Sequence, residues 1–265
     1  VIETDVAIIG GGPAGLMAAE ILSAQGLRVD LFDAMPSVGR KFLLAGRGGL
    51  NITHSEPFER FATRFAERSA ALTPMLAAFS PDDLRQWCLG LGLETFVGSS
   101  GRVFPQEMKA APLLRAWLSR LRQQGVRVHA RHRWQGWTAN GELTFTTPNG
   151  SATTQPRATL LALGGGSWSR LGSDGRWAPW LQERGVDVAP LRAANCGFDV
   201  APTGEGRSGW SEHLTSRHAG QPLKPVTLTF TDRHGHSETR QGEFVLTESG
   251  IEGSLVYAFA SRIRD

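Results

Sequence analysis

Cysteines and long apolar segments are scarce in this sequence. Only Cys88 and Cys196 occur among the 265 residues, and their wide separation fits neither a metal site nor a redox pair. An enzyme that works through two neighbouring cysteines is therefore excluded, and a reducing, cytoplasmic compartment is favoured. No stretch approaches eighteen uncharged apolar residues, so we expect no membrane span. Because Val1–Asp5 leads directly into an apolar strand, we expect no signal peptide before it.

A large excess of charge of one sign is also missing. The chain has 28 Lys and Arg against 25 Asp and Glu, a net charge of +3 and a pI near 9.3. The arginines that cluster between Arg115 and Arg133 could indicate a nucleic-acid surface. They alternate, however, with an apolar helical stripe that consists of Leu114, Trp117, Leu118 and Leu121. This pattern favours the solvated face of an amphipathic helix, so we expect no nucleic-acid partner.

Apolar segments and turn-forming residues predict an α/β fold. A buried strand is expected at Thr4–Ile9, a helix from about Pro13 to Gln25, and a second strand at Arg28–Phe32. This βαβ start implies a parallel sheet. The other predicted elements are helices from Ser80 to near Gly90 and through Leu114 to Gly125, strands at Val126–Ala130 and Thr159–Leu163, and hairpin turns at Asn140-Gly141 and Asn149-Gly150.

The composition of the chain changes after about Ala193. The segment from Pro202 to Pro225 is rich in turn formers, and Val226–Phe230 alternates like a half-exposed strand. Ser254–Arg264 has a helical pattern. We therefore expect one domain over residues 1–192 and the start of a second, β-rich domain over residues 193–265.

The strongest functional signal is Gly10-Gly11-Gly12-Pro13-Ala14-Gly15, a G-x-G-x-x-G between a predicted strand and a predicted helix. Gly10 permits the tight turn, Gly12 lets the backbone approach a pyrophosphate, and Gly15 allows close packing of helix and strand. The free amides of the helix N-terminus, around Ala14, then face the phosphates. Asp33 ends the second strand, where its carboxylate can accept hydrogen bonds from an adenosine ribose and would repel a 2′-phosphate. The fingerprint alone leaves FAD and NAD both open.

The segment after Asp33 separates these two cofactors. Val38-Gly39-Arg40-Lys41 resembles a G-R-K motif of flavoproteins with two dinucleotide-binding domains. Arg40 and Lys41 could neutralise phosphate charge through charge-assisted hydrogen bonds, although either residue taken singly could belong to a solvated basic turn. A glycine-rich loop farther on carries Arg47 and Asn51. In such a fold this loop would pass beside the pyrophosphate and the flavin.

Several spaced motifs resemble one bacterial flavoprotein family, which is named after a Haemophilus hypothetical protein and has aminoacetone oxidase and a bile-acid reductase among its relatives. The matching segments are Gly39–Lys41, Gly46–Thr53, Gly101–Pro105 with Lys109-Ala110, Leu163–Ser167, Gly172–Gly175 and Phe244–Gly253. The resemblance implies a Rossmann-like FAD-binding domain of the two-dinucleotide-binding-domain flavoprotein type, with a β-rich second domain inserted in it. It also implies a C-terminal segment that contacts the flavin, which we expect these 265 residues to lack.

The resemblance assigns further cofactor contacts. Gly164 and Gly165 would form the turn that returns the chain to the FAD site. The strand at Val126–Ala130 would bring a backbone group near Val128 to the adenine edge. Many relatives have Arg-Cys just before the residue that corresponds to Asn51, whereas this chain has Gly49-Leu50. A mechanism that uses that cysteine is therefore excluded.

Side chains with catalytic potential give weaker signals. His54 follows the glycine-rich loop and could assist proton transfer, but a polar loop role is favoured. The histidines form no convincing metal site, and we expect none. Five tryptophans could suggest a substrate cage, and Trp168, beside the second glycine turn, is the one expected to touch the cofactor region. No catalytic residue is identified.

Together these patterns indicate an FAD-dependent oxidoreductase whose flavin accepts or donates a hydride. Its substrate would be an unidentified small molecule, with NAD(P)H as a candidate electron donor. Two alternatives stay open. An NAD-dependent dehydrogenase would share the fingerprint but would need a nicotinamide-side acid or base after the fourth strand, and we find none. A flavin-binding module without turnover would need only the cofactor contacts.

Overall fold

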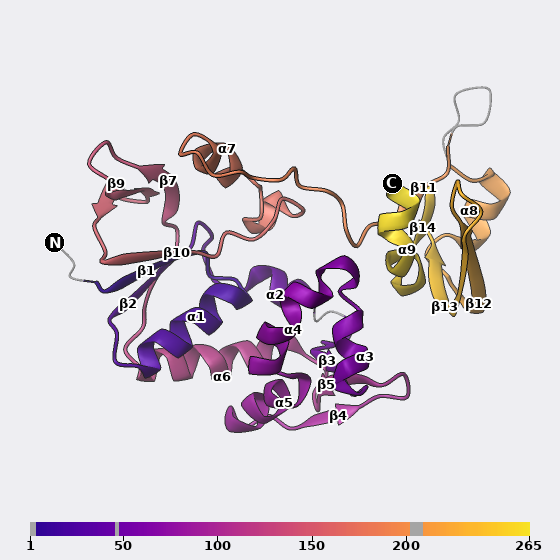
Figure 1. Ribbon diagram of the computed structural model, residues 1–265, viewed down its shortest axis with the longest axis horizontal. Helices are drawn as coiled ribbons and strands as arrows, with labels where there is room; N and C mark the ends of the chain where they lie inside the picture. The colour runs from indigo at the N-terminus through magenta and orange to yellow at the C-terminus, as the bar shows by residue number, and fades with distance from the viewer. Residues whose placement is uncertain (1–3, 46–47, 202–208) are drawn as a thin grey trace. The chain divides into compact units, whose positions relative to one another are not determined.

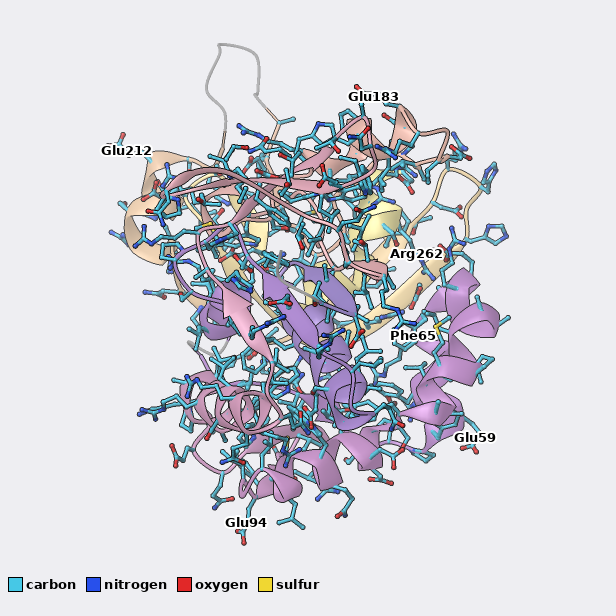
Figure 2. The ribbon with its side chains drawn as sticks, turned by 90° about the vertical axis from the view of Figure 1, so that its left-hand side faces the viewer. Glu59, Phe65, Glu94, Glu183, Glu212 and Arg262 are labelled. Carbon is cyan, nitrogen blue, oxygen red and sulfur yellow. The ribbon has the colours of Figure 1, made fainter. Side chains whose placement is uncertain are left out.

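The computed structural model describes residues 4–45, 48–201 and 209–265. The chain divides into two compact units, Val1–Val188 and Ala189–Asp265 (Figure 1). Charged side chains such as Glu59 and Glu94 of the first unit are exposed and extend from its surface (Figure 2). Among the described residues, no helix combines the length and the apolar character that crossing a membrane requires.

A four-stranded parallel sheet forms the centre of the first unit. Its strands are β1 (Val6–Ile9), β2 (Val29–Phe32), β6 (Arg127–His129) and β10 (Ala158–Leu161), in the order β10-β1-β2-β6. Every residue of β1 and β2 is buried, as expected for strands covered on both faces. Buried Asp30 in β2 pairs with Arg127 and His129, whose side-chain nitrogens lie 2.5 and 2.6 Å from its carboxylate oxygens. This ion pairing joins β2 to β6.

Helices cover one face of the parallel sheet and a small antiparallel sheet covers the other (Figure 1). The helices are α1 (Pro13–Ala24) and α6 (Ala110–Gln123), and the small sheet consists of β7 (Arg133–Trp137), β8 (Leu143–Thr147) and β9 (Gly150–Thr154). Successive residues of a strand point to opposite faces. For this reason β1 supplies Ile8 to the core under the helices and Ile9 to the core under the small sheet.

A helical region with a three-stranded antiparallel sheet lies between β2 and α6 in the sequence. Its elements are α2 (Arg40–Ala45), β3 (Thr53–His54), α3 (Phe58–Thr63), the 3₁₀ turn η1 (Ala66–Arg68), α4 (Ser69–Ala78), α5 (Pro81–Gly90), β4 (Thr95–Val97) and β5 (Arg102–Pro105). Helix α5 begins with a capping box: the Asp83 amide donates to Ser80 Oγ at 3.2 Å, and the Ser80 amide donates to the Asp83 carboxylate at 2.8 Å. After β10 the chain forms η2 (Ser169–Leu171) and α7 (Trp177–Gln182).

The second unit is an antiparallel sheet with two helices. Its elements are β11 (Phe198–Asp199), α8 (Glu212–His218), β12 (Pro222–Thr231), β13 (Ser237–Leu246), β14 (Gly250–Glu252) and α9 (Ser254–Arg264), with strand order β11-β14-β13-β12. Helix α9 packs on the sheet through the fully buried Phe259, whose ring centroid lies 6.3 Å from that of Phe230 in β12. The cation of Arg240 in β13 lies over the same Phe259 ring.

The structure confirms the predicted fold class, a Rossmann-like α/β domain together with a β-rich second unit. The parallel βαβ start, the α5 and α6 helices, both hairpins of the small sheet and helix α9 are all present. Strand β10 ends at Leu161, two residues earlier than predicted, although the Ala162 amide still donates to the Ile9 carbonyl of β1 at 2.8 Å. The boundary at residue 193 and the insertion of the second domain into the first stay predictions.

Candidate dinucleotide site

Two glycines of the β1–α1 turn are required by the packing of the protein itself. Gly10 has φ +109°, a left-handed conformation that side chains disfavour, and a Cβ there would overlap the carbonyl oxygen of Ala162. A Cβ on Gly15 would overlap the carbonyl oxygen of Gly10. These contacts allow α1 to start directly against the ends of β1 and β10.

Gly12 differs, because nothing in the protein accounts for its missing side chain. It is the N-cap of α1 with φ −79° and ψ 179°, a conformation that any residue adopts. No described atom outside its immediate neighbours lies within 4 Å of the position a Cβ would take. Gly12 also lines the cavity described below. The N-cap also lacks a side-chain acceptor, so the first amides of α1 stay free for a ligand.

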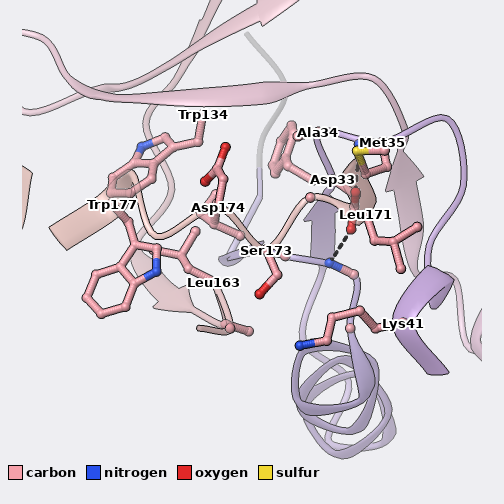
Figure 3. A pocket seen from close by; sticks show the side chains of 18 of the residues that line it. Asp33, Ala34, Met35, Lys41, Trp134, Leu163, Leu171, Ser173, Asp174 and Trp177 are labelled. Carbon is pink, nitrogen blue, oxygen red and sulfur yellow. Dashed lines mark hydrogen bonds between the residues drawn. The ribbon is translucent and has the colours of Figure 1, made fainter. Parts of the chain in front are cut away.

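A cavity of about 730 Å³ opens at the carboxyl ends of β1, β2 and β10 (Figure 3). The last residues of these strands, Ile9, Phe32 and Leu161, form part of its wall. Helix α2 contributes Arg40 and Lys41. In open parallel sheets, ligands bind in the crevice outside the carboxyl ends of the strands. The cavity is therefore in the position that the topology favours for a ligand.

Asp33 follows β2 directly and is fixed beside the glycine turn (Figure 3). Its Oδ2 accepts a hydrogen bond from the Gly11 amide at 2.7 Å, and its Oδ1 accepts one from the Met35 amide at 2.7 Å. Burial raises the pKa of this carboxyl, while the two amides and the charges of Arg133 and Arg40 act in the opposite direction. Each carboxylate oxygen can accept a further bond.

Positive charge exceeds negative charge around the cavity. The described lining has four cationic and two anionic side chains, a net formal charge of +2, and these are Arg40, Lys41, Arg133, Arg176, Asp33 and Asp174. Lys41 Nζ donates to Ser167 Oγ at 3.2 Å. Arg40 Nε is buried without a hydrogen-bond partner among the described residues. A pyrophosphate diester, with two negative charges, complements this excess.

The structure brings together most, but not all, of the residues that the sequence predicts as cofactor contacts. Those that line the cavity are Gly10, Gly12, Ala14, Asp33, Arg40, Lys41 and Gly164. Gly15 and Gly165 are outside the cavity lining. The carbonyl of Gly165 accepts a hydrogen bond from Ser173 Oγ at 2.9 Å. Asn51 is exposed and outside the cavity lining. Arg47 lies outside the described residues.

Two expectations about the adenine side are not supported by the cavity lining. Val128 pairs with Leu31 inside the parallel sheet, is 40% exposed and does not line the cavity. The chain turns at Arg131, which has φ +57°, and only the following residues, His132 to Gln135, reach the cavity. Trp168 is 51% exposed and also lies outside the lining.

The lining residues that were not predicted as cofactor contacts include Arg133, Asp174 and Arg176 and three aromatic residues. Trp134, Trp177 and Trp180 line the cavity. Trp134 lies in the amphipathic strand β7, a pattern that predicts its burial. No local pattern shows that α7 packs against Trp134. The contact depends on how the small sheet and α7 pack over the ends of the parallel strands.

His54, the last residue of the short strand β3, is held in place by the surrounding backbone. Its Nδ1 accepts a hydrogen bond from the Glu56 amide at 3.1 Å, so in the neutral ring Nε2 carries the proton and donates to the Ser100 carbonyl at 3.1 Å. The ring also packs where a Cβ on Gly101 would be. Within the described parts of the chain, no group of three or more His, Cys, Asp or Glu side chains is arranged to hold a metal ion.

A glycine turn between a parallel strand and a helix, an acidic residue at the end of the next strand and a cationic cavity between them define a Rossmann-type dinucleotide-binding domain. Residues 4–256 match the family model described as the HI0933-like protein Rossmann domain. The chain belongs to this family, which confirms the resemblance seen in its motifs.

Solved structures are similar to the chain at low sequence identity. The 3-ketosteroid-Δ4-(5α)-dehydrogenase of Rhodococcus jostii RHA1 is 17% identical, with 70% of this chain and 54% of that chain covered and a TM-score of 0.50. Thermovibrio ammonificans THI4 is 20% identical, with coverages of 61% and 58% and a TM-score of 0.41. An aklavinone-11 hydroxylase, solved with FAD and aklavinone, is 14% identical, with coverages of 59% and 32% and a TM-score of 0.33. The chain thus spans between a third and three fifths of the length of these structures.

Proposed function

We propose that this chain binds FAD in the cavity and acts as an FAD-dependent oxidoreductase. The observation that carries the proposal is the open position at Gly12. The protein leaves this site free at the start of α1 although its own packing does not require a glycine there. A pyrophosphate that approaches the backbone is the ligand for which this motif needs a glycine.

The lining residues suit the successive parts of FAD. The free amides at the start of α1 and the cations of Arg40 and Lys41 would hold the pyrophosphate. Asp33 would accept hydrogen bonds from the adenosine ribose, because each of its oxygens keeps an acceptor position beside the amide it already binds. Gly164, with φ +69°, lets the connection after β10 pass close to the same ligand.

The isoalloxazine ring would supply the redox chemistry, which is the transfer of a hydride to or from an organic substrate. The protein would contribute orientation, charge and exclusion of water. This division of tasks agrees with the cavity lining, in which the charged side chains of Arg40, Lys41 and Asp33 suit contacts with the cofactor. We propose a small organic molecule as substrate and NADH or NADPH as a candidate electron donor.

Family membership favours FAD over NAD, since the fingerprint itself accepts either. An NAD-dependent dehydrogenase remains the alternative enzyme, and a flavin-binding module without turnover remains the alternative outside enzymes. Both share the Gly12 and Asp33 contacts. They differ in the ligand that copurifies and in its reactivity.

Purification followed by mass analysis of the extracted ligand tests the proposal. We expect FAD, with the visible absorption bands of an oxidised flavin. Anaerobic addition of NADH or NADPH then distinguishes a reductase, whose flavin is bleached, from a protein that needs another donor. Extraction of NAD, or a wild-type protein that binds neither FAD nor ADP, would overturn the FAD assignment.

A further inference from the structure

Three tryptophans form an aromatic end of the cavity, and a histidine joins this end to Asp33. The aromatic end consists of Trp134 in β7 with Trp177 and Trp180 in α7. Figure 3 shows Trp134 and Trp177 across the cavity from Asp33. His132 directly precedes β7 and also lines the cavity. Its backbone amide donates to the Asp33 carbonyl at 2.8 Å, so His132 is attached to the residue that would hold the ribose.

The imidazole ring of His132 is held in place by its neighbours. Its Nδ1 lies 2.8 Å from the carbonyl oxygen of Ala130. The ring also packs among three other rings, with centroid distances of 5.9, 5.4 and 6.3 Å to Phe32, His129 and Phe145. Phe32 is itself part of the cavity wall. Contacts of this kind favour one orientation of the His132 ring.

The contact of Nδ1 determines which nitrogen of His132 can accept a hydrogen bond. A carbonyl oxygen only accepts, so Nδ1 carries the proton and donates to Ala130, and Nε2 of the neutral ring keeps a free lone pair. Nε2 makes no hydrogen bond to a described residue, and it is not among the buried, unpartnered side-chain atoms of the described chain. It therefore keeps accessible surface. The wall next to Asp33 thus provides an acceptor that the protein itself does not use.

We infer that His132 recognises the adenine of FAD, with Nε2 accepting a hydrogen bond from the 6-amino group of the base. This inference rests on the proposed function. The Gly11 amide binds the Asp33 carboxylate, and the His132 amide binds the Asp33 carbonyl. With the pyrophosphate at the glycine turn and the ribose on Asp33, the base comes next and meets His132. The amino group is the only N–H donor of this adenine, so it is the group that an acceptor selects.

An acceptor in this place distinguishes purines by the group on carbon 6. Adenine has an amino donor there. Hypoxanthine has a carbonyl oxygen, which would bring a second acceptor toward His132 Nε2, and unsubstituted purine has only a C–H. A site that is built to bind an N–H group disfavours analogues that lack it. His132 is therefore a specificity-determining residue that selects adenine against its deaminated counterpart.

Three nucleotides that differ in the group on carbon 6 test the inference on the wild-type chain. The probes are ADP, inosine diphosphate and purine riboside diphosphate. We expect ADP to bind about three- to tenfold more tightly than purine riboside diphosphate, which is the effect of one hydrogen bond. Inosine diphosphate should bind no more tightly than purine riboside diphosphate, because its oxygen cannot donate to Nε2.

His132→Phe removes the acceptor and keeps an aromatic ring among the neighbouring rings. We expect ADP binding to weaken about three- to tenfold, while binding of purine riboside diphosphate and of inorganic pyrophosphate stays unchanged. The preference for ADP should therefore disappear. His213→Phe is the matched control, because His213 is exposed on α8 of the second unit and is outside the cavity lining. Its preference for ADP should equal that of the wild type.

Equal affinity of the wild type for all three nucleotides would overturn the inference. So would a preference for ADP that persists in His132→Phe, or an equal loss of pyrophosphate binding in that variant. If His132→Phe does not fold, His132→Leu, which also lacks an acceptor, takes its place in the same measurements. A wild type that binds FAD in any of these cases leaves the proposed function standing, whereas a wild type that binds neither FAD nor ADP overturns both.

Discussion

The two ends of the cavity are built in different ways. The end at which we propose that the pyrophosphate binds comes from one continuous turn, Gly10 to Ala14, together with Asp33 and the first turn of α2. The aromatic end is assembled from β7 and α7, which are separated in the sequence by β8, β9, β10 and η2. The difference shows which part of a binding site a local motif can specify. A turn and a helix N-terminus are local, whereas a wall between two packed layers depends on the tertiary fold.

The largest loss of FAD affinity is expected for a substitution at Gly12. Gly12→Val should lower the affinity for FAD at least about a hundredfold, or about 2.8 kcal/mol, because its side chain would occupy the cavity where the pyrophosphate approaches. Thermal unfolding should stay close to that of the wild type, since nothing described lies within 4 Å of the new Cβ. The affinity is measured by titration of the apoprotein with FAD.

Gly15→Ala is the counterpart that separates ligand binding from folding. Its Cβ would overlap the carbonyl oxygen of Gly10, so the turn itself must move. We expect a clear fall in the unfolding temperature of this variant, with loss of FAD binding as a consequence. If Gly12→Val unfolds as easily as Gly15→Ala, or copurifies fully loaded with FAD, the interpretation of Gly12 as a ligand contact is wrong.

The next largest effect is expected at Asp33. Asp33→Ala should weaken FAD binding by about 1–3 kcal/mol, roughly five- to 150-fold. The variant loses an acceptor for the ribose and also leaves the amides of Gly11 and Met35 without their partner. Asp33→Asn keeps one side-chain carbonyl, so its affinity for FAD should lie between those of the wild type and Asp33→Ala. Equal FAD affinity of the wild type and Asp33→Ala would contradict the ribose assignment.

Much of the fold can be predicted from the sequence because its signals are local. The Ser80–Asp83 capping box, the apolar stripe of α6 and the buried residues of β1 and β2 each determine one element. Helices α3 and α4 carry no such signal. Helix α4 has no buried residue and contains Pro74, so neither an amphipathic pattern nor a regular start marks it.

The predicted cofactor contacts line the cavity where residues close in sequence are also close in space, and fewer of them do so elsewhere. The glycine turn and the residue after β2 are adjacent in the fold because β1 and β2 are parallel neighbours. The family resemblance predicts that a backbone group near Val128 reaches the adenine edge, but Val128 does not line the cavity. The left-handed turn at Arg131 delays the contact by several residues, and no feature of the sequence marks a non-glycine residue in that conformation.

A smaller loss of FAD affinity is expected when either cation of α2, Arg40 or Lys41, is replaced. Arg40→Gln and Lys41→Gln should each weaken FAD binding about three- to tenfold, as expected for loss of a partly solvated charge-assisted contact. The loss should shrink as salt is raised, because exposed charges are screened. Lys224→Gln, on an exposed residue of the second unit, is the control and should bind FAD like the wild type. An equal loss in all three variants would mean that only the overall charge matters.

The smallest change in FAD affinity is expected when the pH is lowered and the Asp33 carboxyl becomes protonated. Burial raises the pKa of the free carboxyl above its ordinary value of 3.8, and the ionised form is the stronger acceptor for ribose hydroxyls because both of its oxygens accept. Binding should therefore release a proton, so affinity rises with pH up to the raised pKa of the free protein and is level above it. FAD titrations at successively lower pH should show a loss of affinity that begins above the pH range in which an ordinary aspartate titrates. Asp33→Asn has no proton to release at this position, and its affinity should follow a flatter profile over the same range. A wild-type profile that coincides with that of Asp33→Asn would show that the carboxyl is not the group that meets the ribose.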